Sequence, residues 1–355
     1  MLVVDVACSW LNSAYYYQPV STEHPLWLSN MAADGDDNIF VYMGDEQEVP
    51  DGVTHAIIDP SVKTVRRMAF YQRRQLVSVI FHDGVEIIEA FAFHGCVSLP
   101  RIKLLGVREI GDGAFCVCYA LSDVEFGNRL ETVGVQAFYG CNRLRSIKMP
   151  SVRVVQGQAL GHCGQLTDVE FGIDLETICF NSFIYCYRLQ RIAIPLNDNI
   201  FPIARSDQRY NQFNNCSKLT TVDIVGAEGI HNTISSLLMQ SWKNEINEEI
   251  GRINQELPSI RGIEKTNAIQ QWIRSVINGV EHYKAEHNRL LKEHMTLLEL
   301  AVWKTKLDAE DDDNSTLEAQ SKKAKIDTDY VRKEKRITSG ADIVIKNVLP
   351  FLRMA

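Results

Sequence analysis

Apolar residues recur along the first two thirds of the chain at a nearly constant interval of 22 or 23 residues. Each unit has an aromatic position, followed by Cys after three residues (Arg73 in the first unit), Leu after six, Ile or Val after nine and another apolar residue after eleven. One such unit cannot bury its apolar side alone, so the repeat predicts a solenoid in which stacked units share one core. The aromatic positions are Phe70, Phe93, Phe115, Phe138, Leu160, Phe183 and, after a longer interval, Phe213.

The segment that begins at the Leu of each unit predicts a short strand, because its apolar residues alternate with polar ones. Residues 53–58 fit the same strand template ahead of the first full unit. We therefore predict a solenoid of parallel strands over residues 39–230. Residues 1–38 show no such pattern and are predicted to be poorly ordered.

The repeat resembles that of the BspA-type leucine-rich repeat family. The resemblance rests on the Ala-Phe pairs at residues 69–70, 92–93, 114–115 and 137–138, on the Cys-x-x-Leu-x-x-Ile that follows, and on Pro150 and Pro195. It covers residues 53–225. It implies an α/β fold, a right-handed leucine-rich-repeat solenoid with short parallel strands, of the kind found in large paralogous sets of single-celled eukaryotes.

After Ile224 the apolar spacing becomes helical. Thr233 can cap a helix that ends at Pro258, and a second helix is expected to begin near Thr266 and to continue past Trp303. We predict a long antiparallel helical hairpin over residues 233–308. At 1.5 Å per residue the two helices would span about 36 Å and about 64 Å.

The unequal helix lengths leave an apolar stripe at the far end of the second helix without a partner. The stripe consists of Leu291, Met295, Leu298 and Val302. An exposed apolar surface of this kind needs a cover. The apolar tail over residues 341–355 could fold back onto it, or a second protein chain could bind it, as in a homo-oligomer formed through the hairpin.

A polar run separates the hairpin from that tail. It is acidic at its start and basic later, and we predict a disordered charged linker over residues 309–340. Its basic clusters at residues 322–325 and 332–336 faintly resemble a bipartite nuclear signal with a short spacer.

Charged residues occupy the exposed positions of the predicted strands, and their sign changes from each unit to the next. Parallel strands lie about 4.8 Å apart, so opposite charges should face each other. The ladder can enforce register and solubility, or it can form a polar recognition surface; the first interpretation is favoured because surface charges are usually only solvated. Its members are Arg101, Lys103, Asp123, Glu125, Arg145, Lys148, Asp168, Glu170 and Arg191.

Composition restricts the partners. A net charge of −8 and a pI near 5.6 argue against nucleic acid, and no apolar stretch has the length that a membrane helix needs. Six of the nine cysteines share one repeat position, where they are interpreted as small buried hydrophobes rather than disulfides. No secretory signal is recognised at the N-terminus. We therefore expect a cytoplasmic protein, with a nuclear location as the second choice.

Candidate catalytic groups do not converge in the sequence. Cysteines and histidines near the Cys column recur one per unit, whereas zinc needs four converging ligands. We find no Gly-rich phosphate loop and no nucleophile–base pair. Tyr119, Tyr139, Tyr185 and Tyr187 follow the aromatic column and could form a contact patch or fill the rim of the coils. We predict no catalytic, cofactor-binding or metal-binding residues.

These observations favour a non-enzymatic protein–protein interaction scaffold, in which the repeats present a surface and the hairpin oligomerises or recruits. The alternative is a purely structural assembly module with no ligand on the repeats. An enzyme is the third hypothesis and the least supported one. The identity of the protein partner does not follow from the sequence.

Overall fold

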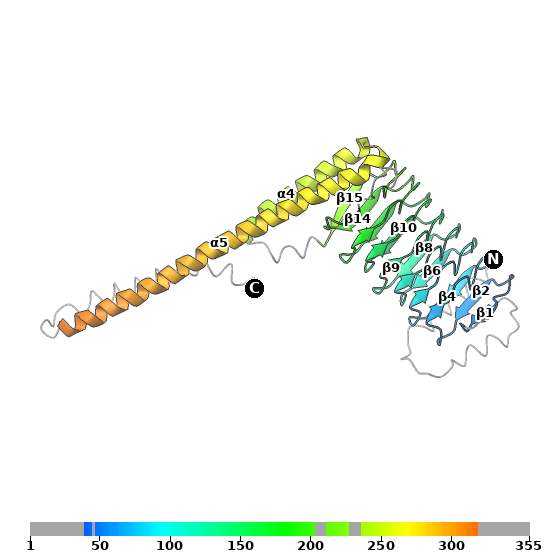
Figure 1. The fold of residues 1–355 in the computed structure, drawn as a ribbon, viewed down its shortest axis with the longest axis horizontal. Helices are drawn as coiled ribbons and strands as arrows, with labels where there is room; N and C mark the ends of the chain where they lie inside the picture. The colour runs from blue at the N-terminus through cyan, green and yellow to red at the C-terminus, as the bar shows by residue number, and fades with distance from the viewer. Residues whose placement is uncertain (1–38, 45–46, 203–210, 227–235, 319–355) are drawn as a thin grey trace, which may run out of the picture.

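The computed structural model describes residues 39–44, 47–202, 211–226 and 236–318 of the 355-residue chain. The repeats form a stack of coils that ends against a helical hairpin, and one helix projects from that end as a long arm (Figure 1). The predicted parallel-strand solenoid followed by two helices is confirmed. The predictions for residues 1–38, for residues 319–340 of the linker and for the tail lie outside the described residues.

Each full coil contributes a longer strand and a two-residue strand, so two parallel ladders run along the solenoid. The two-residue strands pair into one six-stranded sheet, and the longer strands pair as β1-β2-β4, β6-β8 and β10-β12-β14-β15. The longer strands are β1 (Ile39–Tyr42), β2 (His55–Ile58), β4 (Ser78–Ile80), β6 (Arg101–Leu104), β8 (Asp123–Phe126), β10 (Ser146–Met149), β12 (Asp168–Phe171), β14 (Arg191–Pro195) and β15 (Thr221–Val225). The two-residue strands are β3 (Thr64–Val65), β5 (Ile87–Ile88), β7 (Glu109–Ile110), β9 (Thr132–Val133), β11 (Val154–Val155) and β13 (Thr177–Ile178).

The third side of each coil is a run of turns that contains the Ala-Phe pair. The backbone N–H groups of Phe93 and Phe115 donate to the carbonyl oxygens of Ala114 and Ala137 in the next coil, at 2.8 and 2.7 Å. The residue two positions before the aromatic one has a positive φ, which is 60° at Phe91. A left-handed backbone is unfavourable for such a side chain. The hydrogen bonds between coils offset that cost, so the turn geometry depends on stacking.

The aromatic column lies at the centre of the core. Rings of neighbouring coils stack from Phe70 to Phe138, with centroid distances of 4.8–5.3 Å and interplanar angles of 2–9°. Leu160 interrupts the stack, which resumes between Phe183 and Phe213 at 5.5 Å. All seven side chains of this column are fully buried.

The Cys column satisfies backbone groups as well as filling space. Each thiol donates to the carbonyl oxygen of the aromatic-position residue one coil earlier, with Sγ–O distances of 3.0–3.3 Å. Arg73 replaces Cys in the first full coil, and its Nε donates to the Val49 carbonyl oxygen at 2.7 Å. Burial raises the pKa of Cys96 to about 12 and raises the pKa of Cys118 well above its ordinary value.

The helices close the C-terminal end of the core. They are α4 (Ser236–Glu256), the 3-10 helix η2 (Leu257–Ser259) and α5 (Gly262–Glu318). The Asn254 side-chain amide pairs with the exposed edge of β15, because its Oδ1 accepts from the Val222 N–H at 2.8 Å and its Nδ2 donates to the Val222 carbonyl at 3.4 Å. The fully buried Lys265 ammonium donates to the Leu219 and Leu257 carbonyl oxygens. Asn254 thus pairs with strand-edge groups of β15 that have no further strand beside them among the described residues.

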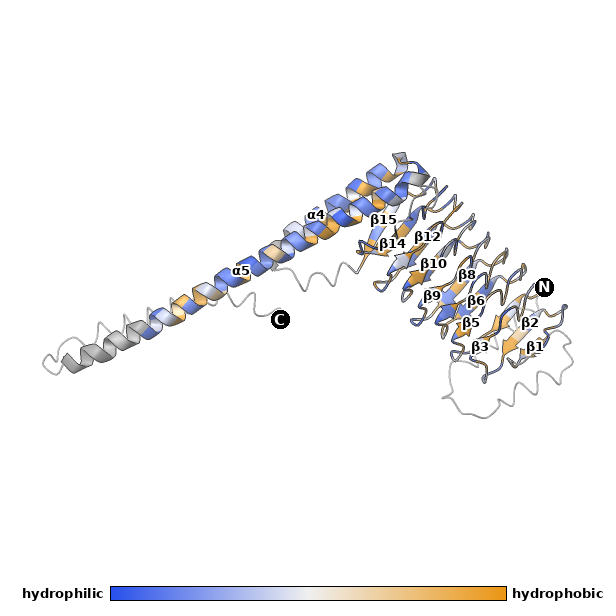
Figure 2. Ribbon diagram, viewed as in Figure 1, coloured by the Kyte–Doolittle hydropathy of each residue, from blue (hydrophilic) through white to orange (hydrophobic). Residues whose placement is uncertain are grey.

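The hairpin is antiparallel, as predicted. The Trp272 Nε1 donates to the Glu249 carbonyl oxygen at 3.0 Å, and the Tyr283 hydroxyl donates to the Glu245 carboxylate at 2.6 Å. Five apolar side chains of α5 are buried over this stretch, namely Ile269, Trp272, Ile273, Val276 and Val280. Figure 2 shows apolar residues among the polar ones along both helices. Thr233, the predicted cap of the first helix, lies outside the described residues.

The boundaries of the second helix differ from the prediction. It begins at Gly262 rather than near Thr266, and it ends at Glu318 rather than near residue 308. The first ten residues of the predicted disordered linker are therefore helical, and that part of the prediction is wrong. The physical reason is that no Gly or Pro interrupts the chain between Gly279 and Glu318; without a breaker, an established helix propagates through polar residues.

We predict that the column cysteines resist iodoacetamide at pH 8 until the solenoid unfolds. With a pKa of about 12, Cys96 holds roughly a thousandfold less thiolate than an ordinary thiol. Cys179 is the most exposed of the described cysteines, so it should react first. Peptide mass spectrometry after labelling with and without urea measures this. Rapid labelling of Cys118 or Cys141 in the native protein would contradict a closed core.

We predict that Lys265→Met lowers the free energy of unfolding by about 1–3 kcal/mol, because two buried carbonyl oxygens lose their donor. Methionine keeps most of the apolar stem, so little packing is lost. Lys284→Met is the control: that ammonium only pairs with Glu281 on the surface of α5, and its loss should cost at most about 0.5 kcal/mol. Urea unfolding followed by circular dichroism compares the two, and equal midpoints would remove the role of Lys265 as an end cap.

Candidate interaction surfaces

The strand face of the solenoid carries the predicted charge ladder. Lys103 and Glu125 are register partners on β6 and β8, and their Nζ–Oε2 distance is 2.9 Å. Lys148 and Glu170 hold the same relation on β10 and β12 at 3.2 Å. All four side chains are substantially exposed. The prediction that opposite charges meet across neighbouring coils holds for this column.

Arg191 is the most highly connected residue of the strand face. Its Nη1 lies 3.2 Å from the Asp168 Oδ1 and 3.8 Å from the Glu170 Oε2, and its Nε lies 2.5 Å from the Asp223 Oδ2. The guanidinium thus joins carboxylates of the coil before and the coil after its own. It is the least exposed cation of the ladder, with 34% side-chain exposure. One fork-shaped cation can connect three strands because guanidinium has several donors in one plane.

Three members of the predicted ladder behave differently. Arg101 and Asp123 are register partners, yet their side chains form no ion pair within the described residues. Arg145 does not belong to the column, since Ser146 is the partner of Asp168. Arg145 precedes β10 by one residue, and its carbonyl oxygen accepts from the N–H and the hydroxyl of Thr167 at 2.8 and 2.9 Å.

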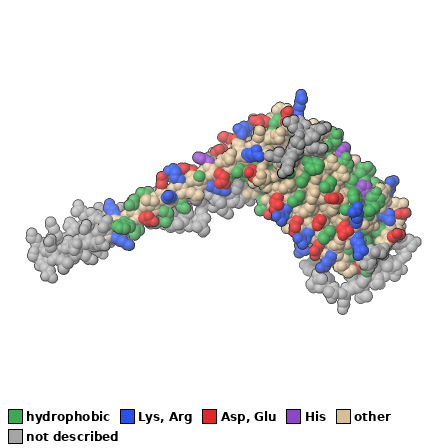
Figure 3. All heavy atoms as spheres, viewed as in Figure 1, with side chains coloured by type: hydrophobic (Ala, Val, Ile, Leu, Met, Phe, Trp, Pro, Cys, Tyr) green, Lys and Arg blue, Asp and Glu red, His purple; other side chains and the backbone are tan. Residues whose placement is uncertain are grey.

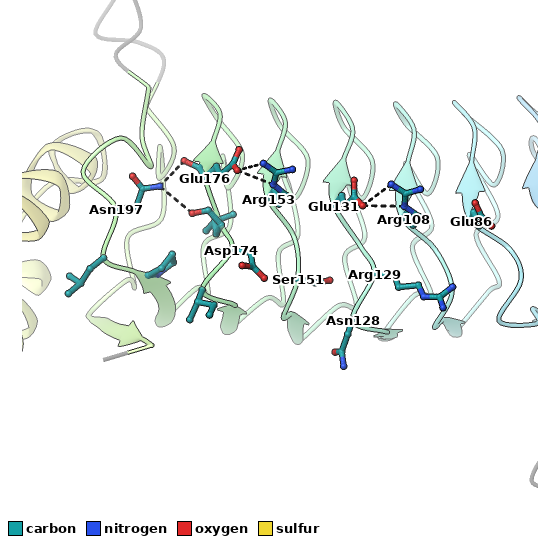
Figure 4. A pocket seen from close by; sticks show the side chains of 14 residues that line it. Glu86, Arg108, Asn128, Arg129, Glu131, Ser151, Arg153, Asp174, Glu176 and Asn197 are labelled. Carbon is teal, nitrogen blue, oxygen red and sulfur yellow. Dashed lines mark hydrogen bonds and ion pairs between the residues drawn. The ribbon is translucent and has the colours of Figure 1, made fainter. Parts of the chain in front are cut away.

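A second charge ladder precedes the two-residue strands and was not recognised from the sequence. Its sign also alternates in every coil. The Arg108 Nη2 lies 2.9 Å from the Glu131 Oε1, and Arg153 pairs with Glu176 in the same way (Figure 4). All its members lie seven residues before the aromatic position, a spacing that would have revealed them. They are Lys63, Glu86, Arg108, Glu131, Arg153 and Glu176.

A groove of about 1040 Å³ runs along the corner between the two ladders. The second charge ladder lines one side, and the loops that follow the longer strands line the other (Figure 4). Arg129 and Asp174 project from those loops, two coils apart. Asn197 closes one end, where its Nδ2 donates to the Leu175 and Glu176 carbonyl oxygens at 3.3 and 3.2 Å. The groove therefore presents charges of both signs together with amide groups, and not charges of a single sign.

The far part of α5 carries the third surface. Met295 and Val302 of the predicted stripe are exposed, whereas Leu291 and Leu298 are half-buried. Leu297, Leu300 and Trp303 are exposed as well, at 54%, 61% and 67%. Hydrophobic and charged side chains alternate along this arm (Figure 3). The tail that was one candidate cover lies outside the described residues.

Aromatic side chains form rows beside the turns. The Tyr71 and His94 rings stack at 5.1 Å, and His162 lies between Tyr139 at 4.8 Å and Tyr185 at 4.5 Å. Burial lowers the pKa of both histidines, so neutral imidazole is favoured in each row. Tyr119 and Tyr187, from the predicted contact patch, are about half exposed.

Within residues 39–44, 47–202, 211–226 and 236–318, no three His, Cys, Asp or Glu side chains are grouped as metal ligands would be. None of the helices described there combines the length and apolar character needed to traverse a lipid bilayer. The ionisable groups of the strand face pair with one another across coils. The chemistry of the surfaces is therefore ion pairing and hydrogen bonding.

We predict that Arg191→Met lowers the free energy of unfolding by about 1–2 kcal/mol, because three carboxylates on adjacent strands lose their shared cation. Lys148→Met removes one exposed pair and should cost at most about 0.5 kcal/mol. Urea unfolding at low salt measures both variants. Equal changes in the free energy of unfolding would show that Arg191 contributes no more than an ordinary surface ion pair.

Among solved structures, the chain is similar to leucine-rich repeat proteins from Bacteroides ovatus and Eubacterium ventriosum. The first is 25% identical over 48% of this chain and 55% of that chain, with a TM-score of 0.33. The second is 20% identical over 54% and 43%, with a TM-score of 0.37. A leucine rich cell surface protein from Faecalibacterium prausnitzii is 20% identical over 51% and 79%, with a TM-score of 0.25. The chain thus matches only 55% and 43% of the first two proteins.

No curated protein matches the chain. The family model for the BspA type leucine rich repeat region, with six copies, matches residues 52–163 and 108–240. These ranges cover more than half of the chain and include every coil from β2 to β15. The resemblance inferred from the Ala-Phe and Cys columns is confirmed, and the chain belongs to the BspA-type leucine-rich repeat family.

Proposed function

We propose that this protein is a non-enzymatic scaffold that binds a protein partner through the strand face of its solenoid and the adjoining groove. The observation that carries the proposal is the row of charged side chains from β6 to β15, which are exposed on β6, β8 and β10 and half-exposed on β12, β14 and β15. A leucine-rich repeat fold supports such a role, since stacked coils create an extended surface rather than an enclosed cleft. Catalysis would require converging acid, base or nucleophile groups in a water-excluding site.

The charge pattern indicates the kind of partner. Both ladders alternate in sign at each coil, and the groove between them contains Arg129 and Asp174 as well as paired charges. A polyanion would meet a carboxylate for every cation, so nucleic acid and an anionic membrane fit the surface poorly. A protein surface with charges of both signs can match the pattern, and such matching gives specificity and orientation.

A reducing, cytoplasmic location is part of the proposal, with the nucleus as the second choice. It is supported by the cysteines: those described are free thiols, and six of them donate hydrogen bonds inside the core. Oxidation would remove these donors. Disulfides are rare where glutathione keeps thiols reduced.

The hairpin supplies the second part of the proposed function, which is oligomerisation or recruitment through the exposed far part of α5. The alternative is a structural module in which this association is the main activity and the repeats bind nothing. The structural alternative is supported by the ion pairs of the strand face, because each of them also connects neighbouring coils.

A charge exchange separates recognition from structure. The double variant Lys103→Glu and Glu125→Lys keeps the pair but inverts its direction on the surface. Like-charge proximity to Lys148 should change stability by at most about 1 kcal/mol. If the strand face is a recognition surface, a protein captured by the wild-type chain is released by the exchanged variant.

The readout is capture by the immobilised full-length chain followed by quantitative mass spectrometry, with urea unfolding of both proteins alongside. Glu281→Lys with Lys284→Glu, an exchanged pair on α5, is the matched control and should keep the captured protein. If the exchange on β6 and β8 leaves every captured protein bound, the strand face is structural and the alternative is correct.

A further inference from the structure

The loops that form one wall of the groove alternate in length. Each loop runs from the last apolar residue of a longer strand segment to the buried Val or Leu that opens the next coil. It has three residues after β4, β8 and β12, at 82–84, 127–129 and 172–174. It has two residues after β6 and β10, at 105–106 and 150–151. This wall therefore has a longer loop at every second coil.

Close backbone packing holds these loops at the coil spacing. A Cβ atom at Gly127 would collide with the carbonyl oxygen of Leu105, and one at Gly172 would collide with that of Pro150. The opposite wall follows the two-residue strands, which pair in one continuous sheet from β3 to β13. Parallel strands lie about 4.8 Å apart, so features that recur at every second coil are separated by about 9.6 Å.

Two charges of opposite sign project from successive longer loops. Arg129 and Asp174 are both exposed and line the groove (Figure 4). Neither forms an ion pair with another residue in the described part of the chain, whereas charges of the second charge ladder pair with each other. Ile173 precedes Asp174, lines the same groove and is 65% exposed. A matching ligand therefore carries an acidic group, a basic group about 9.6 Å away, and apolar surface near the basic group.

The length and polarity of the groove fit an extended chain better than a small molecule. From Glu86 to Asn197 its lining residues span five steps from coil to coil, or about 24 Å. Sites for small molecules are concave and mostly apolar, whereas this groove is lined mainly by charged and amide side chains. An extended polypeptide segment matches both properties.

The coil spacing selects the conformation of that segment. Polyproline II has three residues per turn and rises about 3.1 Å per residue, so every third side chain returns to the same side after about 9.3 Å. A β-strand returns to one side after about 6.7 Å, and an α-helix returns after seven residues and about 10.5 Å. The strands β7, β9 and β11 beside the groove already pair on both edges, so they offer no edge to a β-strand ligand. Polyproline II needs no such edge, because its backbone stays solvated.

We propose that the groove binds an extended segment of a partner protein, about eight residues long in the polyproline II conformation, with an acidic residue three positions from a basic one. The acidic residue pairs with Arg129, the basic residue pairs with Asp174, and an apolar residue beside the basic one covers Ile173. This inference rests on the proposed function and names the chemistry of the partner at the groove.

Synthetic peptides test the spacing of the charges. Two acetylated and amidated peptides, Pro-Pro-Glu-Pro-Pro-Lys-Pro-Pro and Pro-Pro-Lys-Pro-Pro-Glu-Pro-Pro, present the charges in both chain directions. The control peptide Pro-Pro-Glu-Pro-Lys-Pro-Pro-Pro has the same composition, but its charges are two residues apart and on different sides of the helix. In isothermal titration calorimetry with the full-length chain, one of the first two peptides should bind at least about tenfold more tightly than the control.

Charge reversal in the groove tests the contacts. Arg129→Glu should weaken binding of the preferred peptide roughly tenfold, and a peptide with Lys at both charged positions should bind this variant better than the wild type. Asp174→Lys should likewise favour a peptide with Glu at both positions. Arg143→Glu makes the same change of charge at an exposed residue outside the groove and should leave the affinity unchanged. Circular dichroism verifies that all three variants fold.

Failure of this inference is distinguishable from failure of the proposed function. Absence of binding for both spaced peptides at about 1 mM, equal binding of the control peptide, or unchanged affinity in Arg129→Glu would each overturn the inference. The proposed function is judged separately, by release of a captured protein in the exchanged Lys103 and Glu125 variant. Release without peptide binding removes the groove ligand and leaves strand-face recognition standing, whereas peptide binding without release supports the groove and removes the strand face.

Discussion

Every coil of this protein depends on its neighbours to satisfy its backbone and to bury its apolar side. The longer strands and the two-residue strands direct their backbone hydrogen bonds along the stack, and the turns combine such bonds with bonds inside the coil. The Cys column follows the same rule, since each thiol binds a carbonyl oxygen of the preceding coil. Such an architecture is stable only as an array, and its ends are its weak points.

Polar side chains satisfy backbone groups near both ends of the stack. Arg73 satisfies the Val49 carbonyl at the position where later coils use Cys. At the other end, the side-chain amide of Asn254 pairs with the Val222 N–H and carbonyl as a neighbouring strand would. The Lys265 ammonium donates to two carbonyl oxygens. Of these three side chains only Lys265 is buried, and its ammonium is tolerable there because it has two acceptors. The helices are therefore part of the folded unit and not an appendage to it.

Periodicity allowed most of the fold to be predicted, because each apolar column has one physical environment repeated in every coil. Phase was harder. Arg145 was assigned to the strand face, but in a strand a shift of one residue moves a side chain out of the column, and Ser146 holds that place. The second charge ladder was missed because its strands have only two residues, too few for an alternating pattern. The far end of α5 was misjudged because a polar composition suggests disorder, although an established helix can continue through polar residues where no Gly or Pro interrupts it. The groove depends on how neighbouring loops are offset, which no single repeat reveals.

The anchoring of α5 also determines the distance between the repeat surface and a molecule bound to the far end of the helix. Lys265, Trp272 and Tyr283 fix the first turns of the helix against the solenoid and α4, and the remainder continues as one uninterrupted helix to Glu318. A continuous helix is a stiff spacer, unlike a flexible linker whose ends sample many separations. A molecule bound at its tip is thus kept several tens of ångströms from the repeat surface. A rigid helix of this length favours simultaneous binding to two partner sites whose separation matches it, and disfavours binding to pairs of sites with other separations.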